Sequence, residues 1–569
     1  MSSRWLIKPV PDTELVSQLQ NEVSGLPKAL ARILVQRNIT DFDTAKKFFR
    51  PNLSDLYDPY LMKDMEKAVQ RIVAAIRNQE NIMVYGDYDV DGTTSVALMY
   101  GFIKSFYSNV THYIPDRYTE GYGISTIGID YAKDNDVNLI ISLDCGVKAV
   151  DKVKYANTLK IDFVICDHHL PGKELPDAIA ILDPKREDCT YPYKDLSGCG
   201  VGFKLIQALA KEFDVSDTNL YSYLDLVAVS IAADIVPITD ENRILAYHGL
   251  ELLNKSPRLG LKMLIPQEIR GNINITKIVF SIAPKINAAG RIKHATDAVK
   301  LLMAENEMSA RAYTTEINNL NLRRKDLDAE ITDSALLQIR ENNEEDKYST
   351  VVYNPKWHKG IIGIVASRLT EVYYRPTVVF TKGEDGVLVA SARSVRNFDV
   401  HEALEECSHL LDRYGGHMYA AGLSMNEVNL PNFKRKFEQI VKRNIDQVQR
   451  VPTIEIDTEL SFTEIDSKFV NIHKQFQPFG PENMTPQFLT KNVKSAGNER
   501  TMGKDNAHIK LDVFQPEARK VFTAVGFGFG NLYNRMKKEP FDMVYSLEEN
   551  IWQGKSHLQL NIKDIRFNN

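Results

Sequence analysis

The chain lacks the features that mark exported, disulfide-stapled or membrane-spanning proteins. Its five cysteines are odd in number and show no Cys-x-x-Cys spacing, which argues against a disulfide framework and against a structural zinc site. No run of about 18 apolar residues occurs, and the N-terminus Met1-Ser-Ser-Arg-Trp5 has no apolar signal core. We therefore expect a cytoplasmic protein with reduced cysteines and no membrane segment.

An excess of basic residues is also missing. Lysine and arginine number 70 against 75 aspartates and glutamates, a net charge of −5. Nucleic-acid-binding proteins usually carry the opposite balance. Basic residues gather locally at 434–436, at 442–443 and at 323–325. A nucleic-acid groove and a solvated helix face explain these clusters equally well.

With 569 residues the chain exceeds the usual size of one hydrophobic core, so several domains are expected. Alternating strand and helix signals over residues 76–240 predict a parallel α/β domain, and helical spacing without Pro or Gly over 296–341 predicts long connecting helices. The predicted domains are an N-terminal helical segment (1–75), the α/β domain (76–240), a helical connector (241–345), a smaller α/β domain (346–445) and an all-β domain of the OB type (446–569).

Individual elements follow from the same patterns. Strands of the first sheet are expected at 81–86, 110–114, 138–143, 161–166 and 178–182, with crossover helices at 126–135 and 148–159. In the smaller domain we expect strands at 349–353, 377–381 and 387–392 and helices at 361–373 and 401–414. The last domain should hold strands at 453–462, 508–513, 521–525, 541–547 and 557–567.

The segment from Ile82 to Gly92 carries the strongest chemical signal. Its apolar run ends in Asp87, Asp89 and Asp91, just before a helix-like segment. Three carboxylates so close together repel one another unless a cation or a catalytic role offsets the repulsion. An EF-hand calcium loop begins in the same way, but its twelfth residue should be Glu, and here that position is Leu98.

Other apolar runs end in similar residues. One strand is followed by Asp144, another by Asp167-His168-His169, and an apolar helix is closed by Asp234. Ligands of open α/β sheets bind outside the carboxyl ends of the strands, so these groups should meet at one edge. An aspartate after a strand is often only a helix cap, but several at one edge predict a metal site. Mixed imidazole and carboxylate ligands suit manganese, zinc or iron.

The ordered motifs Gly86-Asp-Tyr-Asp-Val-Asp-Gly92, Asp144-Cys-Gly146, Asp167-His-His169 and Ala233-Asp-Ile-Val-Pro237 resemble those of the DHH phosphoesterase superfamily. Further segments make the chain similar to the RecJ branch of single-strand-specific DNA exonucleases. They are residues 115–123, 284–291, 357–369, 391–393 and 415–422. The resemblance spans about residues 80 to 490 in family order and implies a DHH catalytic domain, a DHHA1-like substrate-binding domain at 346–445 and an appended OB-like domain.

The resemblance implies two cations, Mn²⁺ or Mg²⁺, on either side of the scissile phosphate, roughly 3.5 to 4 Å apart. One would be held by Asp89, Asp144, His168 and Asp234, and the other by Asp87 with a bridging Asp144. A water between the ions would attack the phosphodiester. His169 would contact the phosphate, either stabilising the transition state or protonating the leaving oxygen. Asp91 is expected to order the loop or cap the helix near Thr93.

One departure concerns the second ion. Smaller members of the superfamily open the first motif with a histidine where this chain has Met83, so the Asp87 ion has fewer protein ligands. The resemblance also assigns recognition of the 5′ phosphate and the strand. The residues are Asn287, Arg291, Ser391 and Arg393 for the phosphate and Arg117 and His417 along the cleft. Apart from the resemblance, Trp357 and His358 are candidates for stacking on bases, although a Trp that starts a helix is more often a core residue.

These observations predict a metal-dependent exonuclease that degrades single-stranded DNA from the 5′ end to mononucleotides in recombination and repair. Single-strand binding protein and a helicase are the partners that the resemblance implies. A phosphodiesterase for oligonucleotides or cyclic dinucleotides would be a compact chain with histidine at position 83 and no OB-like tail. A non-catalytic replication scaffold would lack several of the acidic and histidine ligands, all of which are present here.

Overall fold

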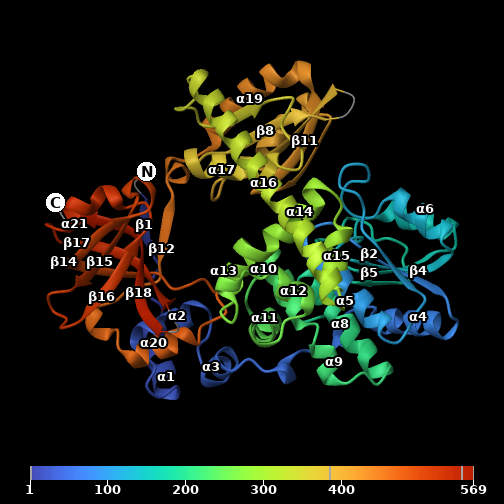
Figure 1. The fold of residues 1–569 in the computed structure, drawn as a ribbon, viewed down its shortest axis with the longest axis horizontal. Helices are drawn as coiled ribbons and strands as arrows, with labels where there is room; N and C mark the ends of the chain where they lie inside the picture. Colours follow the sequence, from blue (N-terminus) through green and yellow to red (C-terminus); the bar gives the residue numbers. More distant parts are fainter. Residues whose placement is uncertain (1–2, 384–385, 553–554, 568–569) are drawn as a thin grey trace.

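The computed structural model describes residues 3–567 except 384–385 and 553–554. Three sheet-based bodies are visible in Figure 1, with the C-terminal barrel on the left, the first sheet on the right and a third body above them. Helix α16 (Glu307–Glu341) runs from the first body to the upper one. No described helix combines the length and apolarity that a membrane crossing needs.

The first body is built on a five-stranded parallel sheet with the order β3-β2-β4-β5-β6. Its central strands are short runs of β-branched and other apolar residues buried on both faces, which is the pattern of a covered parallel sheet. The predicted strands are confirmed to within two residues. Their bounds are β2 Asn81–Gly86, β3 Val110–Tyr113, β4 Val137–Leu143, β5 Asp162–Cys166 and β6 Ala180–Leu182.

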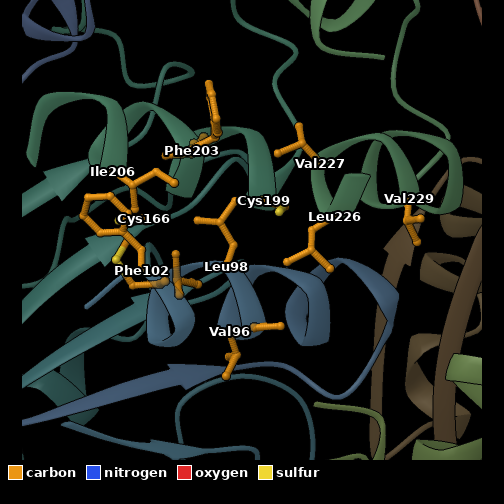
Figure 2. Packing of buried hydrophobic residues seen from close by; sticks show 14 of the residues in the cluster. Val96, Leu98, Phe102, Cys166, Cys199, Phe203, Ile206, Leu226, Val227 and Val229 are labelled. Atoms are coloured by element: carbon orange, nitrogen blue, oxygen red, sulfur yellow. The ribbon is translucent and has the colours of Figure 1, made fainter. Parts of the chain in front are cut away.

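Helices cover both faces of this sheet. Helices α6 (Thr126–Asp134) and α7 (Val150–Thr158), both predicted, pack on the face that carries Tyr85 and Phe163. Helices α4 (Met65–Arg77), α5 (Val90–Lys104) and α8 (Gly198–Glu212) pack on the other face. Figure 2 shows this core, where Leu98 and Phe102 of α5 lie toward Ile206 of α8 and Leu226 of α10 (Leu224–Ala233).

A helical layer leads from the first body toward α16. The predicted helical stretch 296–341 forms two helices, α15 (Thr296–Leu302) and α16. A π-helical turn at Ile278–Ile282 precedes α14 in the same layer. The remaining helices are α9 Asp217–Tyr221, α11 Asp240–Lys255, α12 Leu259–Leu264, α13 Ile275–Lys277 and α14 Ala283–Ile292.

The upper body holds a mixed five-stranded sheet with the order β10-β11-β9-β8-β7. The predicted helix 401–414 is wrong in its second half. Helix α18 (Val400–Glu405) is followed by a 3-10 turn at Ser408–Leu410, and Arg413–His417 forms β10, where Gly415 and Gly416 pair with β11. The other elements are β7 Thr350–Tyr353, β8 Thr377–Lys382, β9 Val387–Arg393, β11 Ala420–Asn426, α17 Ile362–Tyr373 and α19 Leu430–Asn444.

The C-terminal body is a barrel in which β14, β15, β16, β18 and β17 pair in turn and β17 returns to β14. The sequence patterns did not predict β14, the longest strand. Its polar residues and Gly497 break the apolar alternation. The elements are β12 Thr453–Ile456, β13 Thr458–Glu459, β14 Phe488–Met502, β15 His508–Phe514, β16 Val521–Gly526, β17 Phe541–Trp552, β18 Lys555–Phe567, α20 Ser467–Lys474 and α21 Tyr533–Met536.

The N-terminal residues pack on this barrel, although the helix and strands that follow them in the sequence belong to the first body. Strand β1 (Arg4–Ile7) pairs in parallel with β12. Helices α1 (Thr13–Glu22), α2 (Lys28–Gln36) and α3 (Phe42–Phe49) contribute to the same hydrophobic core as the barrel strands. In Figure 1 the blue N-terminal helices lie beside the red barrel.

Candidate metal centre and substrate cleft

Four neighbouring strands of the first sheet end at the same level, and each is followed by an aspartate. Gly86 pairs in register with Leu143, Leu143 with Cys166, and Cys166 with Leu182. The next residues along the four strands are Asp87, Asp144, Asp167 and Asp183. The parallel register therefore places four carboxylates along one edge of the sheet, as ligand sites of open α/β sheets require.

Asp144 is held by an unusual backbone. Its φ is +59°, in the left-handed region that aspartate tolerates better than most residues. Gly198, the first residue of α8, approaches it so closely that a Cβ there would lie 2.7 Å from Asp144 Cβ. The turn and the glycine together fix the direction of this carboxylate.

His168 lies close to three of the acidic side chains. Its Nε2 lies 3.1 Å from Asp144 Oδ1, 3.6 Å from Asp234 Oδ2 and 3.8 Å from Asp91 Oδ2. Two groups of potential ligands have atoms within 4.8 Å of one another, Asp144 with both histidines and His168 with Asp91 and Asp234. The strand ends and the end of α10 thus converge, as the sequence predicts.

Asp87 and Asp89 complete the centre on its other side. Asp87 Oδ1 accepts a hydrogen bond from the Gly123 backbone, whereas its buried Oδ2 has no hydrogen-bond partner among the described residues. Asp89 is the N-cap of α5 and accepts from Gly92 N–H. A buried carboxylate oxygen without a donor is the state that a cation would satisfy.

Asp91 has a role that the sequence reasoning only partly captured. Helix α5 begins at Val90, so Asp89 and not Asp91 caps it. Asp91 instead accepts hydrogen bonds from the backbone N–H groups of Gly198 and Cys199 and from Ser230 Oγ. It therefore anchors the start of α8, where the helix dipole favours negative charge, and its Oδ2, which accepts from Gly198, lies 3.8 Å from His168 Nε2.

His169 is oriented by a partner that the sequence reasoning left without a role. Its Nδ1 lies 2.7 Å from Asp167 Oδ1, and Asp167 also accepts from the backbone of Val147 and His168. Burial opposes a positive imidazole, but the hydrogen bond with Asp167 outweighs it and raises the pKa of His169. The hydroxyl of Tyr122 lies 3.2 Å from His169 Nε2.

The acids of the centre are electrostatically crowded. Burial, and next the charge of Asp91, raises the pKa of Asp144 well above its usual value, and burial with the charge of Asp89 does the same for Asp87. Burial and the charge of Asp91 raise the pKa of Asp234 to about 8, although 30% of its side chain is exposed. A divalent cation would reverse these shifts, and the oxygen-rich set with one imidazole suits Mn²⁺.

Arginines form a second charged cluster next to the acids. Burial, and then the charges of Arg117 and Arg393, lowers the pKa of Arg291 to about 10. Arg117 lies 4.8 Å over the ring of Tyr88. Within the described part of the chain no ion pair joins these three arginines to a carboxylate. The predicted phosphate residues Arg117, Arg291 and Arg393 therefore do come together, although they lie on three different elements.

The remaining predicted contacts surround this cluster. Ser391 Oγ accepts from Arg393 on β9. Asn287 lies one turn before Arg291 on α14, on the same face of the helix. His417 is exposed on β10, and its register through Ala420 to Arg393 sets it about 10 Å from that strand on the same face of the sheet.

Trp357 does not reach the cleft. Only 7% of it is exposed, and it packs with Ile331 and Ala335 of α16 and with Ile362 of α17. This burial contradicts base stacking by Trp357 and agrees with the alternative that it is a core residue. His358 is half-buried beside Tyr118, and burial followed by the charges of Arg323 and Arg117 lowers its pKa.

The basic residues of α19 are largely paired, and Lys434 and Arg435 line a pocket together with Glu344 and Glu438. Lys434 pairs with Glu344, Arg443 pairs with Glu406, and Lys442 lies over the ring of Tyr348. The five cysteines are buried and unpaired, as predicted. Asp183 is the residue that sequence reasoning missed, although the strand-then-aspartate pattern was visible at 178–183.

A parallel sheet whose strand ends carry aspartates and histidines, beside arginines partly supplied by a second domain, defines a metal-dependent phosphoesterase. The chain matches the DHH family N-terminal domain over residues 81–231, the DHHA1 domain over 346–443 and the RecJ OB domain over 456–564. The chain belongs to the RecJ family of single-stranded-DNA-specific exonucleases, which are phosphodiester hydrolases.

Individual relatives support this membership over nearly the full length. The single-stranded-DNA-specific exonuclease RecJ of Bacillus subtilis is 36% identical over 99% of this chain and 70% of its own, and that of Salmonella typhimurium is 31% identical over 95% and 96%. The crystal structure of RecJ from Thermus thermophilus in complex with Mn²⁺ matches with a TM-score of 0.84 at 26% identity, over 99% of this chain and 79% of that one. Its Mg²⁺ complex matches with a TM-score of 0.78 at 25% identity, over 99% and 78%.

Proposed function

We propose that this chain hydrolyses single-stranded DNA from the 5′ end, releasing mononucleotides, with two divalent cations of Mn²⁺ or Mg²⁺ at the aspartate and histidine centre. The observation that carries the proposal is the pairing of two sites. A crowded set of carboxylates lies next to Arg117, Arg291 and Arg393, which lack acidic partners among the described residues. Cations at the carboxylates would neutralise the first site and hold a phosphodiester there. A terminal phosphate would supply the negative charge that the arginines of the second site lack.

Two sets of residues would hold the cations. We assign Asp89, Asp144, His168 and Asp234 to one ion and Asp87 with Asp144 to the other. The short distances from His168 Nε2 to Asp144 and Asp234 support the first assignment, and the unsatisfied Asp87 Oδ2 supports the second. When bound, such ions activate a water as the nucleophile and neutralise charge on the phosphate. The aspartates supply negative charge and fixed geometry, and Asp91 keeps α8 in place beneath Asp144.

His169 acts on the phosphate in this scheme. Asp167 accepts from Nδ1–H and leaves Nε2 directed toward Tyr122 and the centre. A protonated imidazole there can donate a proton to a phosphate oxygen or to the leaving 3′ oxygen. The raised pKa of His169 keeps the donor form available closer to neutral pH.

The arginine cluster determines the end of the strand from which digestion proceeds. Guanidinium groups bind phosphate through bidentate hydrogen bonds, and their burial strengthens the attraction. Ser391, Asn287, His358 and His417 would line the same cleft. A strand whose 5′ phosphate is held there presents its first internal phosphodiester to the metal centre, so digestion proceeds from that end.

Digestion of end-labelled single-stranded DNA with Mn²⁺ or Mg²⁺ tests the proposal, with Asp144→Asn as the variant. Asparagine tolerates φ +59°, so the backbone is kept while the charge is lost. The wild type should release mononucleotides from the 5′ end, faster with a 5′ phosphate than with a 5′ hydroxyl, and the variant should lose at least 100-fold of the rate, as expected when a charge-stabilising group is removed. Equal digestion of duplex DNA, or an active variant, would reject it.

The setting of the reaction belongs to the same proposal. We propose that the protein acts in the cytoplasm, in recombination and repair, beside a helicase that unwinds its substrate and a single-strand binding protein that covers it. Membership of the RecJ family supports this, and an exonuclease that needs a free single strand requires an activity that exposes one. Co-purification with either partner from cells carrying the tagged chain is the measurement.

A further inference from the structure

Two segments at the centre, the one that carries His168 and His169 and the one that holds Asp234, each expose a large apolar side chain. Ile235 follows Asp234 and is 63% exposed, and Leu170 follows His169 and is 69% exposed. Their neighbours Val236 and Ile238 are buried in the core, so this part of the chain readily buries apolar groups. Two exposed aliphatic side chains beside a charged centre therefore call for a ligand with an apolar surface.

The backbone at Ile235 makes the observation stronger. Its φ is +60°, a left-handed conformation that costs a β-branched residue on the order of 1–3 kcal/mol. Asp234 is the C-cap of α10, so Ile235 occupies the position where helices usually carry glycine or asparagine. The helix end thus disfavours isoleucine, and its exposed side chain adds no packing that would offset the strain.

The position of Ile235 along the cleft indicates what it contacts. From the arginine cluster, Arg117 lies over Tyr88, Tyr88 packs against Tyr122, and Tyr122 packs against His169. His169 packs against His168, whose Nε2 lies 3.6 Å from Asp234 Oδ2, so Asp234 and Ile235 follow next along this row of contacts. A strand bound by its 5′ phosphate would pass the tyrosines first and reach Ile235 after the scissile phosphate.

We propose that Ile235, assisted by Leu170, is a positioning residue that packs against the base of the second nucleotide, immediately 3′ of the scissile phosphodiester. This rests on the proposed exonuclease function. Apolar contact with the face of a base is indifferent to sequence, as digestion of any strand requires. The contact holds the departing strand in line with the centre while the ions and His169 act on the phosphate.

Ile235→Asn separates this role from a structural one. Asparagine relieves the backbone strain, so the melting temperature should stay the same or rise. The kcat/KM for a single-stranded oligonucleotide should fall about tenfold, through loss of an apolar contact. A fall of more than about 5 °C in melting temperature would overturn the proposal, because it would show that Ile235 stabilises the fold. Leu170→Asn, at the neighbouring loop, should lower kcat/KM in the same direction.

A modified substrate locates the contact. With a tetrahydrofuran residue in place of the second nucleoside, the wild type should slow about tenfold, and Ile235→Asn should slow no further because the contact is already lost. With the same residue at the first nucleoside, wild type and variant should slow by equal factors. If the modified second nucleoside slows Ile235→Asn by the same factor as the wild type, the proposal is wrong. A wild type that does not digest the unmodified strand would instead refute the exonuclease function itself.

Discussion

At the scale of single residues, the metal centre depends on the close approach of Gly198 to Asp144. Gly198→Ala would place a Cβ 2.8 Å from Asp144 Oδ1, so the carboxylate must turn away. We expect at least a tenfold loss of metal-dependent hydrolysis. The melting temperature should also fall, because the new Cβ would lie 2.7 Å from Asp144 Cβ and 3.0 Å from its Cα, which turning the carboxylate does not relieve. Isothermal titration with Mn²⁺ should show weaker binding.

Gly200→Ala is the matched control for this change. It lies two residues further along α8, and its nearest contact would be 3.4 Å from Leu196 Cβ, away from the carboxylates. It should bind Mn²⁺ and digest DNA like the wild type. Equal behaviour of the two variants would mean that the position of Asp144 is not set by the glycine.

Residue identities at the centre were predictable where a strand pattern ended in a charged side chain. Asp87, Asp144 and Asp167 follow apolar runs, and parallel strands bring such ends together. Asp91 was harder, because its hydrogen bonds reach α8, more than 100 residues away in sequence. Trp357 was mistaken for a stacking platform because a sequence does not show which side of a ring another helix covers.

At the scale of elements, α20 carries a histidine that makes the barrel sensitive to acid. His473 is 4% exposed and stacks on Phe476, and its Nε2 has no hydrogen-bond partner in the part of the chain that the structure describes. Burial, and next the charge of Arg37, lowers its pKa from 6.5 to about 4. As the pH falls, the unfolded chain therefore takes up a proton on this histidine before the folded chain does. The neutral imidazole contributes its full stability above pH 6.5, and the free energy of unfolding decreases as the pH falls from 6.5 toward 4.

His473→Phe should remove this sensitivity. Phenylalanine fits the aromatic surroundings and takes up no proton. Chemical denaturation at pH 7 and pH 5 should show the wild type losing about 2 kcal/mol more stability than the variant over that interval. His409 is exposed and meets water in both states, so His409→Gln should keep the wild-type pH dependence. An unchanged dependence in His473→Phe would show that the buried imidazole is not the source.

Helices and strands were predicted correctly where the apolar residues of a segment repeat with one regular spacing. The buried strands of the first sheet, the helices around it and α16 all follow from local apolar spacing. Strand β14 failed because a curved barrel strand with register shifts does not alternate regularly. The end of the predicted helix 401–414 failed because Gly415 and Gly416 pair with a neighbouring strand, a contact that no local pattern reveals.

At the scale of the whole molecule, one buried arginine joins three separate parts of the chain. Arg243 on α11 donates to the carbonyl of Phe48 at the end of α3 and to those of Phe476 and Gln477 after α20. Its guanidinium lies 3.9 Å over the Phe48 ring. The catalytic body, the N-terminal helices and the barrel therefore meet at this side chain.

This assembly could not be predicted from the sequence. Local periodicity finds helices α1 to α3, but not that they share a core with a barrel more than 400 residues later. Nothing distinguishes Arg243 from a surface arginine of an amphipathic helix, because its acceptors are backbone carbonyls and carry no sequence signature. The contacts between bodies depend on tertiary packing alone.

Arg243→Lys tests how much the assembly depends on this contact. An ammonium group has three donors and no planar fork, so it leaves some of the buried carbonyls without a donor, at a cost of about 3 kcal/mol. We expect a larger radius of gyration by small-angle X-ray scattering as the barrel separates from the catalytic body. The KM for long single strands should rise while that for short ones changes less, because only long strands reach the barrel.

Arg311→Lys, at an exposed position of α16, is the control and should match the wild type in both measurements. Identical scattering from Arg243→Lys and wild type would show that the remaining contacts, such as Arg37 with Asn483 and Ile238 with Pro481, hold the barrel in place without it.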